Sequence, residues 1–293
     1  MPPAAIIVNR TRIRDLGRFR RRCGQAAEAG GWEPWFLETS RDDGGLEQAR
    51  AAVAAGARLV FAAGGDGTVR ACAHAVAGTG VPLAILPRGT ANLAAHALGV
   101  PLRWRDALAT GFGGRERRVD LAVADGLYFV AMAGMGLDAA VVGATPGLLK
   151  HGLGWPAYAA AGIARLPGRP HVFTVRLDGG EPLTRRARSV VVGNAGLLPG
   201  GFALLPDARL DDEVLDLGIL APADPLGWGL VAHRVLTRSR RDDRHLERHR
   251  ARRVEIEADT ELPRQVDGEV IAPGRSLTVT LCPGALLVRV PAR

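Results

Sequence analysis

Residues 58–77 read RLVFAAGGDGTVRACAHAVA, and this stretch decides the fold. The run 58–63 is typical of a buried parallel strand, and the glycine-rich loop after it leads into a helix predicted over 68–77. Glycines at such a point let the backbone approach an anion, and the start of a helix directs free N–H groups toward phosphate. The stretch therefore predicts a phosphate-binding corner, although a tight turn in which Thr68 caps the helix explains it equally well.

The alternation of strand and helix continues on both sides of this corner. Strands are predicted at 5–9, 32–38, 58–63 and 82–87, and helices at 16–29, 46–55, 68–77, 91–98 and 104–110. This pattern predicts βαβ units in a doubly wound parallel sheet, which is an α/β fold. A second loop, PRGTAN at 87–92, follows the next strand, so both loops are expected at the carboxyl edge of the sheet, where such folds bind ligands.

The second part of the chain has a different texture. Short apolar runs occur at 128–131, 171–177, 189–192, 214–220, 253–257, 276–281 and 286–290, and helices are predicted only at 153–166 and 225–238. The pattern favours a mostly antiparallel β-sandwich. We therefore expect an α/β nucleotide-binding domain over residues 1–120 and a β-sandwich domain over residues 121–293, with the last residues as candidates to return to the first domain.

Composition and charge limit the class of protein. The chain has 293 residues, of which 47% are hydrophobic and 23% charged, a balance that excludes a disordered or fibrous chain. The first residues lack a signal-peptide pattern and the three cysteines are far apart, so we expect a cytoplasmic protein without a disulfide framework. The net charge of +8 favours an anionic partner, namely a nucleotide, a nucleic acid or an acidic lipid surface.

The arginine-rich run 234–253 contains the sequence HLERH, with His245 and His249 at helical spacing. The order of residues is not that of a zinc-binding helix, so we interpret the run as a solvated charged segment. It has no interleaved aromatic residues, and therefore no nucleic-acid partner is expected.

Five ordered motifs resemble the bacterial lipid kinases of the diacylglycerol kinase catalytic-domain family, which are relatives of sphingosine kinases and, more distantly, of NAD kinases. The motifs are GGDGT at 64–68, PRGTANLAAHALGVP at 87–101, AGMGLDAAVV at 133–142, GNAGLLPGGFALLPDARLDDEVLDLGIL at 193–220 and QVDGE at 265–269. The resemblance covers almost the whole chain. It implies an ATP- and Mg²⁺-dependent kinase that phosphorylates the hydroxyl of diacylglycerol or a similar lipid alcohol, as in phospholipid biosynthesis.

The resemblance also implies roles for individual residues. Glu269 is implied as the base that accepts the proton of the lipid hydroxyl, with Asp267 beside it. A Mg²⁺ site is implied at the Asp212 carboxylate and the backbone carbonyls of Arg209 and Val214. Read from the residues alone, Asp66 could hold Mg²⁺ or polarise a hydroxyl, and VDGE is an ordinary hairpin turn. The implied nucleotide-binding residues are Asn9, Thr39, Gly64, Gly65, Asp66, Gly67, Thr68, Val69, Arg70, Thr90 and Asn92.

Some positions depart from the family pattern. Arg70 and Ala71 stand where the family usually has Asn-Glu, and Leu93 stands where it often has Asp. Arg10 replaces the usual Pro after the first strand, and Glu213 replaces the usual Gly of the metal loop. They motivate one alternative, a non-catalytic module that binds a nucleotide or an anionic lipid. A second alternative is a phosphotransferase similar to NAD kinase, but the extended match in the second half of the chain favours the lipid kinase.

A lipid substrate predicts peripheral contact with an anionic membrane surface. The segment 139–177 has no acids, and its aromatic and basic residues suit a bilayer interface, although a helix packed on the sandwich explains its aromatic residues as well. The oligomeric state stays open, with a homodimer as one alternative. The residues concerned in the segment are Lys150, Trp155, Tyr158, Arg165, Arg169 and Arg176.

Overall fold

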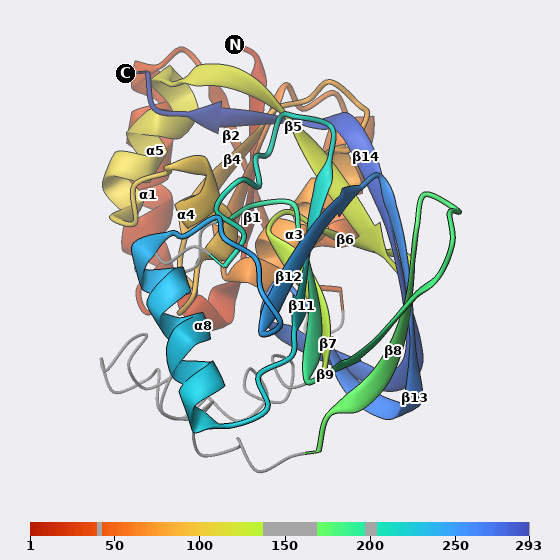
Figure 1. Ribbon diagram of the computed structural model, residues 1–293. Helices are drawn as coiled ribbons and strands as arrows, with labels where there is room; N and C mark the ends of the chain where they lie inside the picture. The colour runs from red at the N-terminus through yellow and green to blue at the C-terminus, as the bar shows by residue number, and fades with distance from the viewer. Residues whose placement is uncertain (40–42, 137–168, 197–203, 293) are drawn as a thin grey trace. The chain divides into compact units, whose positions relative to one another are not determined.

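The computed structural model describes residues 1–39, 43–136, 169–196 and 204–292 (Figure 1). The chain divides into two compact units. One comprises Met1–Leu121 and Pro283–Arg293, and the other comprises Ala122–Cys282. The predicted helix at 153–166, and most of the aromatic and basic segment that contains it, lie outside the described residues.

The first unit contains a parallel sheet, as the alternating pattern predicts. Its order is β2-β1-β3-β4, and the end of β14 follows β4 through the pair Leu83 and Val288. All residues of β3 and β4 are buried, as expected of parallel strands covered on both faces. The bounds are β1 (Pro3–Val8), β2 (Glu33–Glu38), β3 (Leu59–Gly64), β4 (Leu83–Pro87) and β14 (Glu269–Val290).

All five helices predicted for this unit are present, with small shifts at their ends. Asp15 caps the first of them, because its carboxylate accepts the Arg18 N–H at 2.8 Å. A short 3₁₀ helix, η1 (Arg10–Arg12), follows β1. The helices are α1 (Leu16–Ala29), α2 (Leu46–Ala54), α3 (Asp66–Val76), α4 (Leu93–Leu98) and α5 (Trp104–Gly113).

The strands of the second unit pair antiparallel, which confirms the predicted sandwich architecture. The order is β12-β11-β10-β7-β13-β14; β8 joins β13 to β9, and β6 pairs with β5. The bounds are β5 (Arg115–Ala124), β6 (Leu127–Phe129), β7 (Met132–Gly136), β8 (His171–Leu177), β9 (Leu183–Ala187), β10 (Ser189–Gly193), β11 (Leu215–Leu220), β12 (Leu246–Ala251) and β13 (Arg253–Val266).

One helix, α8 (Pro225–Thr237), covers part of the second unit's sheet. Along β10, Val190 and Val192 face a core that is shared with β7, β11 and β13, whereas Val191 faces the other side. That other side packs against Val231 and Val235 of α8. The sheet is therefore buried on both faces where α8 crosses it.

Several strands differ from the prediction, and charge is the reason for most of the differences. Strands β9 and β12 are rich in arginine and lack the apolar runs used to predict strands, and β5 begins with the charged sequence RERR before its apolar half. The interpretation of the arginine-rich run as a solvated segment holds for its exposed arginines but not for the HLERH residues, because His245 and Leu246 are buried and β12 begins at Leu246. Outside a helix, His245 and His249 lose their helical spacing. The runs at 276–281 and 286–290 belong to the single strand β14.

No helix in the described part of the chain is long and apolar enough to cross a membrane.

The packing of α5 on the first sheet depends on a glycine. A Cβ added at Gly111 would lie 2.1 Å from Cε1 of the buried Phe61 ring. Overpacking of this kind costs about 1–3 kcal/mol, so Gly111→Ala is expected to lower the free energy of unfolding even though alanine favours helices. In the same helix a Cβ at Gly113 would meet nothing within 4 Å, and Gly113→Ala is expected to be neutral or stabilising. Urea unfolding measures both variants, and wild-type stability of Gly111→Ala would contradict this packing.

Candidate functional site

The two glycine-rich loops of the first unit lie against each other. A Cβ added at Gly89 would be 2.8 Å from the Cα of Gly65, and the N–H of Arg88 donates to the carbonyl of Gly64 at 2.8 Å. A side chain at Gly89 would therefore force the backbone to shift, and a Cβ at Gly65 would lie in tight contact, 3.3 Å from the Cα of Gly89. The GGDGT and PRGTAN loops therefore form one backbone-lined surface at the ends of β3 and β4.

Asp66 connects the two loops. Its Oδ2 accepts the N–H of Asn92 at 2.9 Å, and its Oδ1 accepts the N–H of Leu93 at 2.6 Å. Asn92 has a left-handed backbone (φ 48°), and its side chain pairs with both the N–H and the carbonyl of Gly89. Both carboxylate oxygens of Asp66 thus already bind the start of α4. The contacts favour an anchoring role for Asp66 over the alternative that it holds Mg²⁺ or polarises a hydroxyl.

Thr68 is buried in the first turn of α3 and does not cap the helix. Its Oγ1 accepts a hydrogen bond from Nδ2 of Asn9 at 3.2 Å, and the cap position belongs to Gly65, which has no side chain. A helix without a side-chain cap presents its first N–H groups to whatever lies beyond its end. The N–H groups of Asp66, Gly67 and Thr68 therefore have the arrangement that suits phosphate.

The remaining nucleotide-site predictions fall at the same edge of the sheet, with one exception. Asn9, Thr39 and the exposed Thr90 follow the ends of β1, β2 and β4. Arg70 is half-buried in α3. Val69, by contrast, is buried, and its N–H donates to the carbonyl of Gly65 at 3.0 Å. Val69 therefore packs in the core, and neither its side chain nor its N–H is available to a nucleotide.

In the second unit the QVDGE motif forms a hairpin. Asp267 (φ 46°) and Gly268 (φ 76°) are the two residues between β13 and β14. Two positive φ angles in a two-residue loop are typical of a type I′ turn, so the interpretation of VDGE as a hairpin turn describes its backbone correctly. The turn does not, however, account for the carboxylate.

The Asp267 side chain is only 3% exposed and is held by backbone N–H groups. Its carboxylate accepts hydrogen bonds from Val130 at 2.9 Å, Ala131 at 2.8 Å and Met132 at 3.0 Å. Because these N–H groups turn toward Asp267, the strand predicted at 128–131 ends at Phe129. Asp267 thus fixes the hairpin to residues 130–132, whereas Glu269 at the start of β14 has an exposed side chain.

Asn194 and Gln265 complete this network. Asn194 is fully buried and donates from Nδ2 to the carbonyl of Val130 at 3.0 Å, and Oε1 of Gln265 accepts the N–H of Gly268 at 2.9 Å. Neither residue was among the predicted site residues. The signal available in the sequence for Asn194 is a polar amide that directly follows the apolar run VVVG, whereas Gln265 stands in the polar context RQVDG and has no such signal. The GNAG and QVDGE motifs meet at residues 130–132, because Asn194 binds Val130 and Asp267 binds all three residues.

The predicted metal loop, residues 209–214, borders an open pocket of about 890 Å³. Arg250 donates to Asp212 at 3.1 Å and to Asp216 at 3.2 Å. The other carboxylate oxygens, Oδ1 of Asp212 and Oδ2 of Asp216, are buried and have no hydrogen-bond partner among the described residues. Burial raises the pKa of the Asp216 carboxyl, and the hydrogen bond from Arg250 opposes this effect.

Two buried carboxylate oxygens without donors are suitable ligands for a hard cation such as Mg²⁺. Asp216 was not predicted, although a single acid in the apolar strand 215–220 was the available signal. No group of three His, Cys, Asp or Glu side chains gathers like a metal site anywhere in the described ranges, so backbone carbonyls would have to supply further ligands. Glu213 has a left-handed backbone (φ 56°), a conformation that favours glycine. The backbone therefore explains why the family pattern has glycine at this position.

Comparisons with known proteins agree with these motifs. Residues 3–124 match the model of the diacylglycerol kinase catalytic domain, and residues 131–290 match that of the YegS C-terminal NAD kinase beta sandwich-like domain. A probable lipid kinase YegS-like protein of Pseudomonas aeruginosa is 37% identical over 250 residues, which cover 82% of this chain and 79% of the relative.

Two further proteins extend the comparison. A diacylglycerol kinase of Bacillus subtilis is 30% identical over 277 residues, which cover 92% of this chain and 90% of the relative. The crystal structure of a putative diacylglycerol kinase from Bacillus anthracis shares the fold, with a TM-score of 0.81 and 20% identity over 99% of this chain and 97% of that one. From these matches and its motifs, the chain belongs to the diacylglycerol kinase catalytic-domain family of lipid kinases, with a YegS-type C-terminal β-sandwich.

Proposed function

We propose that this kinase transfers the γ-phosphoryl group of ATP, with Mg²⁺, to the hydroxyl of diacylglycerol or a similar neutral lipid alcohol. One observation carries the proposal: an exposed carboxylate, Glu269, stands on a hairpin that the buried Asp267 fixes through three backbone N–H groups. A general base must be both accessible and held in place, and this hairpin provides both conditions.

The nucleotide phosphates are assigned to the start of α3. Its uncapped N–H groups and the glycine backbones of Gly65 and Gly89 support this assignment, because helix N-termini and side-chain-free loops accept phosphate oxygens. Asn9, Thr39, Thr90 and the remaining predicted residues of the two loops would border the same nucleotide, with Val69 left out.

The chemistry assigned to Glu269 is the removal of one proton. Glu269 accepts the hydroxyl proton as the lipid oxygen forms a bond to the γ-phosphorus. The bond from that phosphorus to the bridging oxygen breaks, and ADP leaves. Asp267 does not exchange protons in this scheme; it keeps the hairpin in place.

Mg²⁺ bound with the nucleotide would neutralise phosphate charge. A second, structural Mg²⁺ is assigned to the metal loop, with the carboxylate of Asp212 and the carbonyls of Arg209 and Val214 as ligands. The buried, donor-free oxygens of Asp212 and Asp216 support this assignment and add Asp216 to the predicted set.

The substrate also determines where the protein works. A neutral lipid alcohol stays in the bilayer, so the kinase would act as a cytoplasmic protein on the membrane surface, and the net charge of +8 suits an anionic bilayer. Phosphorylated diacylglycerol is a phospholipid, so the reaction would belong to phospholipid synthesis.

An NAD kinase-like activity is the second candidate, because the model matched by residues 131–290 is described as NAD kinase beta sandwich-like. Incubation with labelled ATP, Mg²⁺, a panel of lipid alcohols and NAD, followed by separation of the products, distinguishes the two activities. A labelled lipid supports the proposal. A labelled nucleotide alone favours the alternative, and no labelled product favours a non-catalytic binding module.

Glu269→Gln is expected to lower kcat by ~10²–10⁴, because loss of a general base has costs of this order. Its melting temperature should stay near that of the wild type, because the side chain is exposed. Asp267→Asn is expected to lower the free energy of unfolding by about 1–3 kcal/mol, since an amide cannot accept all three N–H groups. Steady-state kinetics and thermal unfolding of both variants separate the two roles, and an unchanged kcat in Glu269→Gln would refute the assignment of the base.

Gly65→Val is expected to weaken nucleotide binding by ~10-fold or more, because a side chain at Gly65 would enter the surface where phosphate is assigned and would press on Gly89. Gly24→Val in α1 is the control, since a Cβ there would meet nothing within 4 Å. Titration of a fluorescent ATP analogue measures both affinities. Wild-type affinity in Gly65→Val would place the nucleotide elsewhere.

Mg²⁺ is expected to raise the melting temperature of the nucleotide-free protein, because a ligand that binds only the folded state stabilises it. Asp212→Asn should abolish this increase. Asp211→Asn removes the same charge from the exposed neighbour and should retain the increase. Thermal unfolding with Mg²⁺ or with a chelator tests the site, and an equal increase in all three proteins would exclude it.

A further inference from the structure

Helix α8 has an exposed apolar face as well as a buried one. Val231 and Val235 pack into the second unit, whereas Leu226 is 74%, Leu230 41% and Leu236 58% exposed. These three leucines belong to a set of seven large hydrophobic side chains exposed in the described part of the chain. Their concentration on one helix distinguishes this surface from scattered exposed apolar residues, which are normal.

The three leucines lie on one side of α8. At about 100° per residue, Leu226, Leu230 and Leu236 fall within a sector of about 120°, and Val231 and Val235 lie on the opposite side. His233 falls within the same outer sector and is exposed. The outer face is thus a strip of leucines along the helix that also carries the exposed His233 and Thr237.

Positive charge is concentrated in the last turns of the helix and in the segment that follows it. Residues 225–244 contain five arginines and two aspartates, and the side chains of Arg238, Arg240, Arg241 and Arg244 are exposed. Arg240 pairs with Asp207 at 2.7 Å. Within the described ranges, neither Arg241 nor Arg244 forms an ion pair with an acid.

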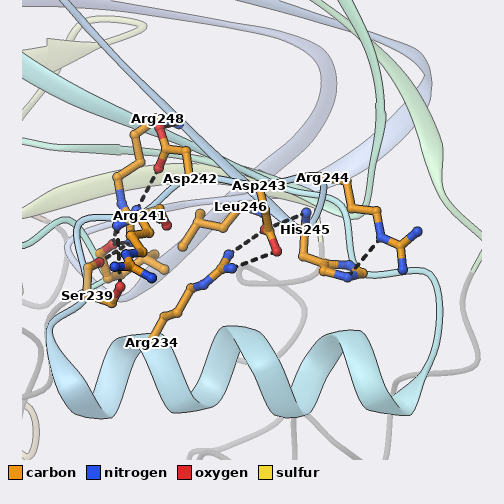
Figure 2. A network of polar contacts seen from close by, with 10 residues as sticks. Arg234, Ser239, Arg241, Asp242, Asp243, Arg244, His245, Leu246 and Arg248 are labelled. Atoms are coloured by element: carbon orange, nitrogen blue, oxygen red, sulfur yellow. Dashed lines mark hydrogen bonds and ion pairs between the residues drawn. The ribbon is translucent and has the colours of Figure 1, made fainter.

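The two aspartates of this segment are already neutralised, as Figure 2 shows. Asp242 pairs with Arg248 at 2.7 Å, and both oxygens of Asp243 accept from the Arg234 guanidinium. The hydrogen bonds from Arg234 hold the pKa of the Asp243 carboxyl well below its usual range. Of the exposed arginines, Arg241 and Arg244 therefore keep their charge without an acidic partner among the described residues.

The same contacts hold the surface in one place. Oδ1 of Asp243 also accepts the N–H of His245 at 2.9 Å and that of Leu246 at 3.2 Å, at the start of β12. Arg234 on the helix and the residues before β12 are thus tied together through one carboxylate. Residues 226–244 are therefore held in one arrangement, with Arg241 and Arg244 toward opposite ends of the helix in Figure 2.

We propose that this surface, residues 226–244, docks the kinase on an anionic bilayer. Exposed leucines would enter the boundary between headgroups and acyl chains, and the arginines beside them would contact lipid phosphates. The proposal rests on the proposed lipid kinase function, because a bilayer is where such a substrate is found. Nucleic acid fits the surface less well, since it has no use for an apolar strip and the aromatic residue of the helix, Trp228, is partly buried against the core.

Sedimentation with phosphatidylcholine vesicles, with and without phosphatidylglycerol, tests the proposal on the full-length protein. Replacement of Leu226, Leu230 and Leu236 by Ser is expected to lower the fraction bound to anionic vesicles by ~10-fold or more. Arg241→Gln with Arg244→Gln should lower it by about 10- to 30-fold at low salt and should have little effect at high salt. Leu102→Ser and Arg58→Gln are controls, because each removes an exposed residue of the same type from the first unit.

Kinase assays separate this proposal from the proposed function. On a short-chain diacylglycerol dispersed in detergent the α8 variants should be as active as the wild type, and on anionic vesicles they should be slower. If the wild type phosphorylates no lipid and α8 still determines vesicle binding, the docking surface stands and the lipid kinase assignment fails. If the kinase is active and the leucine variant sediments like the wild type, the docking surface is wrong.

Two further measurements address other occupants. Analytical ultracentrifugation of the wild type and the leucine variant detects a dimer interface on α8. A change of oligomeric state without a change in vesicle binding would overturn the proposal. Binding of single-stranded DNA that depends on Arg241 and Arg244, together with unchanged vesicle binding, would also overturn it.

Discussion

A buried carboxylate must have partners for its lone pairs, and Asp267 finds them in the backbone of a neighbouring segment. Its three accepted N–H groups come from residues 130–132, where the chain leaves β6 and enters β7, and Asn194 donates to the carbonyl of Val130 in the same segment. The hairpin that carries Glu269 is thereby fixed to the middle of the second unit. An exposed acid on a free hairpin would sample many positions, and the buried acid two residues earlier prevents this.

The first unit also uses an aspartate that accepts backbone N–H groups. Asp66 accepts adjacent N–H groups of Asn92 and Leu93 and so joins two loops that follow different strands. In both units an aspartate of a recognisable motif holds backbone N–H groups of a separate segment. Loss of these aspartates would therefore affect structure and activity together, so activity measurements alone do not identify a catalytic group.

Features of the fold that depend on apolar periodicity and on turn residues could be predicted from the sequence. The parallel first sheet, its helices and the hairpin at Asp267 follow from apolar runs and glycine positions. Strands β5, β9 and β12 were not predicted, because arginine side chains stand at positions where an apolar alternation was sought. Ion pairs such as that of Arg185 with Glu247 at 2.7 Å stabilise these arginines in the folded protein. The contacts of Asp66, Asn194 and Asp216 could not be predicted, because each joins segments whose distance in space depends on the tertiary fold. The family motifs include the segments that make these contacts, but they do not indicate which atoms form the hydrogen bonds.

The route of β14 has a consequence for biosynthesis. The part of β14 up to Cys282 belongs to the second unit, whereas Val288, near the end of the same strand, pairs with Leu83 of β4 in the first unit. As the polypeptide leaves the ribosome, β4 emerges long before its neighbour and remains an open sheet edge while the whole second unit is translated. An unpaired edge is a template for association with other chains. During translation the first unit therefore has an exposed edge at β4 until β14 is synthesised. In this period a chaperone, or fast elongation, would protect the edge from association with other chains.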